Sequence, residues 1–191
     1  SSSDYDGNVN RVFGSISVSE NRQVGSLTTV NGGITLSDNV KADELTTVNG
    51  GVTVGNFCEI DGITVVNGDI EAGQQLVSGD SIESVNGDII LGFGAKVDGS
   101  LITVNGDIEA ADLTLTDNIE TVNGDIRISG NSVIDGDIIY DDPENNDNPS
   151  TPTLSIADTV RLNGEIILER DVKLEIPDTM TSKVRYKSSA M

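Results

Sequence analysis

The chain contains no histidine and no tryptophan, and one of its 191 residues is cysteine. The absence of histidine excludes Ser-His-Asp and Cys-His nucleophilic sites, and also zinc sites with histidine ligands. A single cysteine cannot form an internal disulfide bond, and it says little about the compartment because exported proteins do not require disulfides. We expect Cys58 to be an inert core residue.

Positive charge is also scarce. The sequence has 11 Lys and Arg residues against 32 Asp and Glu residues, so its formal net charge is −21. Nucleic acid is therefore not expected as a partner, because phosphate binding needs many basic side chains, and an anionic membrane surface would repel the chain. No run of 18 apolar residues occurs, so direct insertion into a membrane is not expected. The charge does favour attraction of cations.

The dominant feature of the sequence is a Val-Asn-Gly repeat with a period of 18 or 19 residues. The same frame extends back to Val9, in "VNRVFGSISV", and forward to "LNGEIIL" at 162–168. Self-similarity with this short period is typical of solenoid architectures. The asparagines of the repeat are Asn31, Asn49, Asn67, Asn86, Asn105 and Asn123.

Each repeat has the apolar pattern of short strands. An alternating pair such as Ile34 and Leu36 follows each Asn-Gly, and a weaker apolar segment ends later in the turn, before Asp-Gly in three of the turns. Glycine and β-branched residues recur, and no stretch has the amphipathic 3.6-residue periodicity of a helix, which argues against helical repeats. The sequence therefore predicts an all-β fold, a single-stranded parallel β-helix of about nine turns with three short strands per turn.

The repeat also divides the chain. We expect a leader or cap over residues 1–8, the β-helix over 9–176 with an inserted acidic loop over 141–152, and a cap or tail over 177–191. The inserted loop has three prolines and four acidic residues among its twelve positions, so it cannot form a core. It is either a spacer or a contact for a partner or for Ca²⁺.

The Asn-Gly pairs are interpreted as the structural corners of the coil. Asparagine tolerates the left-handed backbone region and glycine adopts it freely, which would turn the chain. Stacked asparagine side chains can also hydrogen-bond to one another along the rod. The direction of residues such as Thr29 and Thr47 is open, although the constancy of the following valine favours a bend that turns the valine inward.

Acidic residues follow several corners and should form a column. These carboxylates could bind Ca²⁺ between adjacent turns with help from backbone carbonyls, or they could form a simple solvated edge. With Arg127 nearby, they could also serve a carboxylate-dependent carbohydrate enzyme, but no aromatic platform for a sugar is present and we expect no enzymatic activity. The column consists of Asp69, Asp88, Asp107 and Asp125, and a second one of Asp43, Asp61, Asp98, Asp117 and Asp135.

The repeated "TVNGGI" and "TVNGDI" resemble the repeats of exported bacterial β-helix proteins of the adhesin type, and more loosely those of bactofilins, which form polymers. The resemblance covers residues 9–176 and implies a β-helix, but no family catalytic residues exist to carry over. It implies a structural or adhesive module that presents rigid acidic and threonine-bearing faces to a protein or a cell-surface glycan. Bactofilin likeness instead implies end-to-end polymerisation.

The expected localisation and assembly depend on whether the protein is adhesin-like or bactofilin-like. We expect an exported protein, periplasmic or at the cell surface and conceivably a lipoprotein, or a cytoplasmic one if it is bactofilin-like. No cofactor is expected apart from Ca²⁺. The protein should be a monomer if both ends of the rod are capped, because uncovered strand edges invite end-to-end association.

Overall fold

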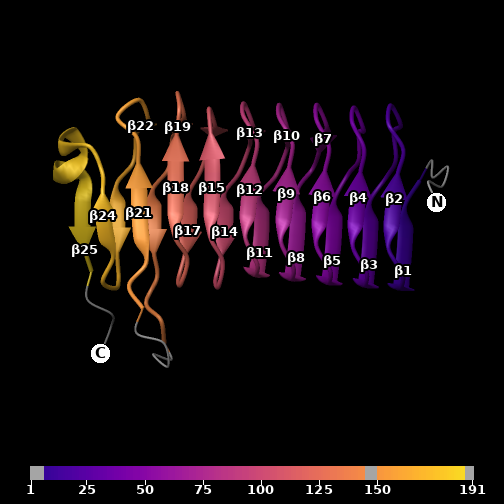
Figure 1. The fold of residues 1–191 in the computed structure, drawn as a ribbon, viewed down its shortest axis with the longest axis horizontal. Helices are drawn as coiled ribbons and strands as arrows, with labels where there is room; N and C mark the ends of the chain where they lie inside the picture. Colours follow the sequence, from indigo (N-terminus) through magenta and orange to yellow (C-terminus); the bar gives the residue numbers. More distant parts are fainter. Residues whose placement is uncertain (1–6, 145–149, 188–191) are drawn as a thin grey trace.

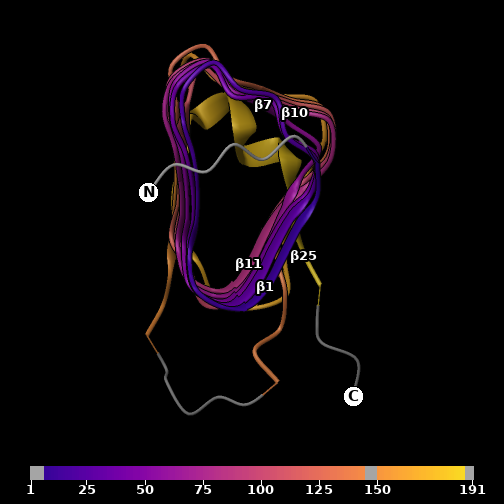
Figure 2. The same ribbon diagram turned by 90° about the vertical axis from the view of Figure 1, so that its right-hand side faces the viewer.

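The computed structural model describes residues 7–144 and 150–187. The chain is an all-β parallel solenoid of about ten turns, which confirms the predicted fold. Its turns stack along one axis, with the first strand, β1 (Val9–Phe13), at one end of the rod and the last strand, β25 (Val184–Tyr186), at the other (Figure 1). Viewed along the axis, the turns superpose into one closed outline (Figure 2).

Three parallel sheets form the walls of the solenoid, and we call them sheets A, B and C. Sheet A contains β1 (Val9–Phe13), β3 (Leu27–Asn31), β5 (Leu45–Asn49), β8 (Ile63–Asn67), β11 (Ile82–Asn86), β14 (Leu101–Thr103), β17 (Ile119–Thr121), β20 (Ile138–Tyr140), β23 (Ile166–Leu168) and β25 (Val184–Tyr186). Sheet B contains β2 (Ile16–Val18), β4 (Ile34–Leu36), β6 (Val52–Val54), β9 (Ile70–Ala72), β12 (Ile89–Leu91), β15 (Ile108–Ala111), β18 (Ile126–Ser129), β21 (Thr153–Ile156) and β24 (Lys173–Glu175). Sheet C contains β7 (Glu59–Ile60), β10 (Val77–Ser78), β13 (Lys96–Val97), β16 (Thr114–Leu115), β19 (Val133–Ile134) and β22 (Arg161–Leu162).

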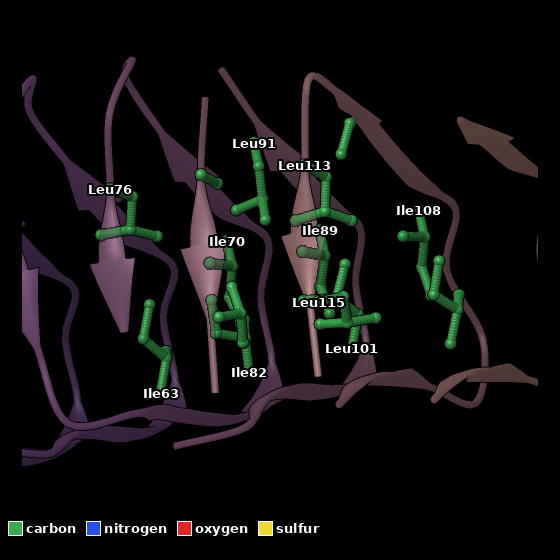
Figure 3. Packing of buried hydrophobic residues seen from close by; sticks show 14 of the residues in the cluster. Ile63, Ile70, Leu76, Ile82, Ile89, Leu91, Leu101, Ile108, Leu113 and Leu115 are labelled. Carbon is green, nitrogen blue, oxygen red and sulfur yellow. The ribbon is translucent and has the colours of Figure 1, made fainter. Parts of the chain in front are cut away.

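The core is a set of aliphatic columns inside the coil. Strand pairing stacks aliphatic residues on aliphatic residues of the next turn, for example Ile82 on Leu101 in sheet A and Ile89 on Ile108 in sheet B. Figure 3 shows these side chains stacked from turn to turn. Each turn buries its apolar surface against its two neighbours, so the stability of the rod is close to a sum of turn and interface contributions.

Side chains of sheet A alternate strictly, and the expected inward bend of the valines is wrong. Thr29 and Thr47 are fully buried, whereas the valine that follows each of them faces outward and is half-buried. The buried hydroxyls have a specific role: Thr29 Oγ1 donates to the carbonyl oxygen of Gly14 at 2.8 Å, and Thr47 Oγ1 donates to that of Gly32 at 2.7 Å. These hydroxyls satisfy carbonyls that would be costly to bury without a partner. Val65 fills the same column in the turn between Thr47 and Ser84.

The glycines of the Asn-Gly corners are required for close packing and not for a left-handed backbone. None of these corner glycines has a φ in the left-handed region, so the conformational reason predicted from the sequence is wrong. A Cβ added to any of them would instead lie closer than 3.0 Å to the carbonyl oxygen of the corner glycine one turn earlier. The stacked glycines are Gly32, Gly50, Gly68, Gly87, Gly106 and Gly124.

The left-handed residues form a column at a different corner, between sheets B and C. Most positions of this column are not glycine, although bulky side chains are disfavoured there. Phe57 is the clearest case, with φ of 58° and a side chain that is 52% exposed. The column contains Asn21, Asn39, Phe57, Gln75, Gly94, Asp112 and Gly130.

Phe57→Asn is therefore expected to stabilise the protein. Asparagine adopts the left-handed region at lower cost, so the free energy of unfolding should rise by about 1 kcal/mol. Denaturant unfolding monitored by circular dichroism measures the change. The matched control is Phe93→Asn, because Phe93 is also exposed but its φ is not positive; equal gains in the two variants would contradict a backbone origin.

Two segments near the C-terminus depart from the repeat. The described parts of the 141–152 insertion project from the Asn-Gly corner side of the coil (Figure 2). After β24, the 3₁₀ helix η1 (Asp178–Lys183) lies within the outline of the coil with Met180 buried, and β25 then pairs with β23. The tail expected over 177–191 thus includes a helix across the C-terminal end and a tenth strand of sheet A. Of the leader expected over 1–8, residues 1–6 lie outside the described residues.

Asn163 does not continue the Asn-Gly corner, contrary to the frame predicted over 162–168. Leu162 pairs with Ile134 in sheet C, and Asn163 Nδ2 donates to Asp135 Oδ1 at 2.7 Å. Asn163-Gly164 therefore stacks on the Asp-Gly corner between sheets C and A. Asn-Gly and Asp-Gly are chemically similar, so the sequence alone did not show that Asn163-Gly164 belongs to the Asp-Gly corner.

Candidate functional surface

The predicted asparagine corners form a continuous amide ladder on the surface. In each step, Nδ2 of one asparagine donates to Oδ1 of the asparagine one turn earlier, over 2.7–3.0 Å. The amide bonding expected from the stacked repeat is confirmed, and it joins six exposed side chains. The ladder consists of Asn31, Asn49, Asn67, Asn86, Asn105 and Asn123.

Arg170 terminates this ladder at its C-terminal end. Its Nη1 donates to Asn123 Oδ1 at 2.7 Å and to the carbonyl oxygen of Val122 at 2.9 Å, and Nη2 donates to the carbonyl oxygen of Ser150 at 3.2 Å. All amide carbonyls of the ladder point toward this end, so a cation there satisfies the last acceptor and opposes the aligned dipoles. Arg170 also ties the inserted loop to the coil.

The acidic column next to the ladder is structural as well. Oδ1 of Asp69 accepts a hydrogen bond from the backbone N–H of Asp88 at 2.8 Å, and Asp88, Asp107 and Asp125 each accept the N–H one turn later at the same distance. The carboxylates satisfy backbone donors at a corner where the strands do not pair, and charge strengthens such bonds. One oxygen of each carboxylate has this partner.

The calcium site suggested for these four carboxylates stays a prediction. Within residues 7–144 and 150–187, no group of three or more His, Cys, Asp or Glu side chains is arranged to hold a metal ion together. Any Ca²⁺ bound at the column would have to use the remaining carboxylate oxygens and water.

The second predicted aspartate column is exposed at all five positions. Two of its members accept hydrogen bonds from neighbouring side chains: Asp98 from Thr116 Oγ1, and Asp135 from Asn163 Nδ2.

The outward faces of sheets A and B remain available for contacts. In sheet A, strand register aligns Thr28, Thr46 and Thr64, and Glu83 follows them in the same column. In sheet B, the outward column begins with Ser17, Thr35 and Thr53 and becomes charged further on. The N-terminal turns therefore present uncharged faces, although the protein is strongly acidic.

Arg127 lies in the charged part of the sheet B column. It stacks between Glu109 and Ser155, in a hollow of about 280 Å³ that Asp107 and Asp125 also line. The structure thus brings together the arginine and two aspartates singled out in the sequence. The hollow is an open shelf, and the described residues around it include no aromatic side chain.

Three carboxylates meet where the chain leaves the coil for the inserted loop. Burial, followed by the hydrogen bond and the negative charge of Glu120, raises the pKa of Asp141 from 3.8 to about 6. Glu169 faces it from the next turn, and its pKa is raised too, first by burial and then by Asp141. Folding therefore shifts Asp141 toward its protonated form relative to the unfolded chain.

Asp141→Asn is expected to stabilise the protein at pH 7 and to flatten its pH dependence. Because the pKa of Asp141 is higher in the folded than in the unfolded state, its stabilising contribution is complete below about pH 4 and is lost as pH rises through about 6. The group is partly exposed, so we expect a gain of about 1 kcal/mol or less at pH 7. Thermal melts between pH 4 and pH 7.5 measure it, with the exposed Asp43→Asn as control; an equal gain from the control would assign the effect to net charge.

Two further expectations can be compared with the structure. Cys58 is fully buried, its thiol lies 3.2 Å from the carbonyl oxygen of Ser37, and burial raises its pKa, in agreement with an inert core residue. In the part of the chain that the structure describes, no helix has the length and apolar character needed to cross a membrane. Arg170 and the loop-side carboxylates were missed in the sequence because they stand where the repeat is interrupted.

Comparisons of the chain with family models, with curated proteins and with solved structures found no match, so its function is inferred from its own geometry.

Proposed function

We propose that this protein is a non-enzymatic structural module of the adhesin type, an exported rod that presents rigid faces to a protein or glycan at a cell surface. The observation that carries the proposal is the use of the repeated polar side chains. Amides bond to amides, carboxylates to backbone N–H groups and buried hydroxyls to corner carbonyls. The repeat thus builds a stiff support, and the outward columns of sheets A and B are left for recognition.

The uncharged N-terminal part of sheet A is the face most suited to close contact. Thr28, Thr46 and Thr64 carry hydroxyl groups, and half-exposed valines such as Val30 and Val48 lie beside them. Desolvating such a face costs less than desolvating carboxylates, so it can approach another surface closely. The acidic faces elsewhere keep the rod soluble.

A triple substitution tests this proposal. Thr28→Glu, Thr46→Glu and Thr64→Glu place on the N-terminal turns the residue that Glu83 and Glu120 already contribute to the same column, so the fold should be kept. We expect binding of labelled protein to purified bacterial cell-wall sacculi to fall at least tenfold. The matched control adds the same charge to sheet B through Ser17→Glu, Thr35→Glu and Thr53→Glu. Absence of binding by the unmodified protein, or equal losses in both variants, would contradict the assignment.

A second candidate function is a scaffold that polymerises end to end. It is favoured by the ends of sheet A, because among the described residues β1 pairs only with β3 and β25 only with β23. Phe13 on β1 and Tyr186 on β25 are 78% and 74% exposed. Against it, η1 lies across the C-terminal end of the core.

Sedimentation velocity separates the two functions. We expect a monomer over a wide range of protein concentration, with Ca²⁺ and with chelator, because η1 covers the core end and the large negative charge opposes association. Growth into long species with concentration would favour the scaffold. A requirement for Ca²⁺ in that growth would assign the cation to the aspartate column.

A further inference from the structure

A groove lies between the inserted loop and the Asn-Gly corner. Its volume is about 460 Å³, larger than the hollow of about 280 Å³ around Arg127. The corner residues that directly follow β14 and β17 contribute its floor, and the outgoing arm of the loop contributes its wall. The lining residues are Val104, Asn105, Val122, Asn123, Asp142, Pro143 and Glu144.

The floor of the groove combines an apolar strip with amide groups. Val104 is 37% exposed, and Val122 lies beside it one turn later. Asn105 and Asn123 each use one Nδ2 hydrogen for the amide ladder, which leaves the second hydrogen of each amide for a ligand. The floor can therefore pack against alkyl carbons and donate hydrogen bonds to carbonyl oxygens.

The wall carries negative charge that the described part of the protein does not neutralise. Asp142 and Glu144 form no hydrogen bond or ion pair with any residue among 7–144 and 150–187. Arg170, which contacts Asn123 at the floor of the groove, is occupied elsewhere, since its guanidinium donates to carbonyl oxygens and to the Asn123 amide. A cation entering the groove would find carboxylates available on one side.

We propose that this groove binds a lysine or arginine side chain on an extended segment of a partner protein. The alkyl stem would lie on Val104 and Val122, the cationic head would reach Asp142 and Glu144, and the free amide hydrogens would bind backbone carbonyls of the segment. The charge of −21 would speed the encounter with a basic partner. The inference rests on the proposed display function and names one class of partner for it.

The test measures binding of a fluorescein-labelled Lys-Val-Lys-Val-Lys peptide to the full chain by fluorescence anisotropy in 150 mM salt. A labelled Gln-Val-Gln-Val-Gln peptide serves for comparison. We expect the lysine peptide alone to bind. Asp142→Asn with Glu144→Gln should weaken binding roughly tenfold. Glu20→Gln with Asp43→Asn removes the same charge from exposed sites at the other end of the rod and should change the Kd less than twofold.

The apolar floor has its own variant. Val122→Thr keeps the shape of the side chain and replaces one methyl with a hydroxyl, so it should weaken the lysine peptide roughly threefold. Thermal melts establish that each variant is folded. Equal weakening of peptide binding in the Asp142/Glu144 variant and in the Glu20/Asp43 control would overturn the proposal, because it would assign binding to the overall charge.

Two other outcomes would also overturn it: no binding of the lysine peptide to the unmodified protein, or displacement of that peptide by a neutral chitin hexasaccharide, which would make the groove a glycan site. The cell-wall assay keeps this result separate from the proposed function. If the variant with Asp142→Asn and Glu144→Gln no longer binds the peptide but still binds sacculi, both proposals stand as separate sites. If the unmodified protein binds sacculi but not the peptide, only the groove proposal fails.

Discussion

Gly87→Ala is expected to destabilise the protein by about 3 kcal/mol. A Cβ at this corner would meet the carbonyl group of Gly68 and the backbone N of Asp69, and Gly106 is stacked in the same way one turn later. Backbone atoms cannot move aside as a flexible side chain can, so the turns must separate locally. The loss should appear in urea unfolding as a lower midpoint.

Gly7→Ala is the control for this prediction. Gly7 is exposed, and a Cβ added there would have no neighbour within 4 Å. We expect its unfolding midpoint to match that of the unmodified protein. A similar loss in both variants would mean that glycine is needed for backbone freedom and not for close stacking. No loss in Gly87→Ala would mean that adjacent turns slide easily, contrary to a closely packed rod.

Tyr140→Ala should cost about 4 kcal/mol, as large-to-small changes at fully buried aromatic residues do. Tyr140 is fully buried and occupies the inward column of sheet A, next to Thr121, at the turn where the loop is inserted. Its hydroxyl donates to the carbonyl oxygen of Gly124 at 2.7 Å and lies 3.3 Å from that of Thr153, so it joins both sides of the insertion.

Tyr140→Phe separates the hydroxyl from the ring. It should cost about 1–3 kcal/mol, because the carbonyl of Gly124 would lose a buried donor. Tyr186→Ala is the control, since that ring is 74% exposed. Chemical unfolding of the three variants gives the comparison. A phenylalanine variant as stable as the unmodified protein would show that water or another donor replaces the hydroxyl.

Periodicity was sufficient to predict the fold and the core. A strict spacing of apolar residues and Asn-Gly pairs fixes which residues stack, and the sequence therefore predicted both the aliphatic core and the amide ladder of Asn31 to Asn123. These features depend only on register, which any repeat displays directly.

Features that the spacing of the repeat does not determine were not predicted correctly. The valine after Thr29 points outward because the strand alternates without a bend, and the inward hydroxyl of Thr29 binds a glycine carbonyl, a contact that no pattern of hydrophobicity shows. The left-handed corner was missed because Phe57 and Gln75 occupy it where glycine or asparagine would be the usual signal. Arg170 was missed because it binds Asn123 from 47 residues away.

The stacking direction of the hydrogen bonds also determines how the rod responds to mechanical force. The hydrogen bonds that join successive turns, backbone and amide alike, run from each turn to the next, and β1 and β25 lie at opposite ends of the rod (Figure 1). Tension applied between these ends would load one interface at a time and peel turns away singly. Tension applied across a side face would load the bonds of several turns together. A partner held on sheet A or in the loop groove would therefore be retained under a pull that, applied through the ends, would unravel the coil.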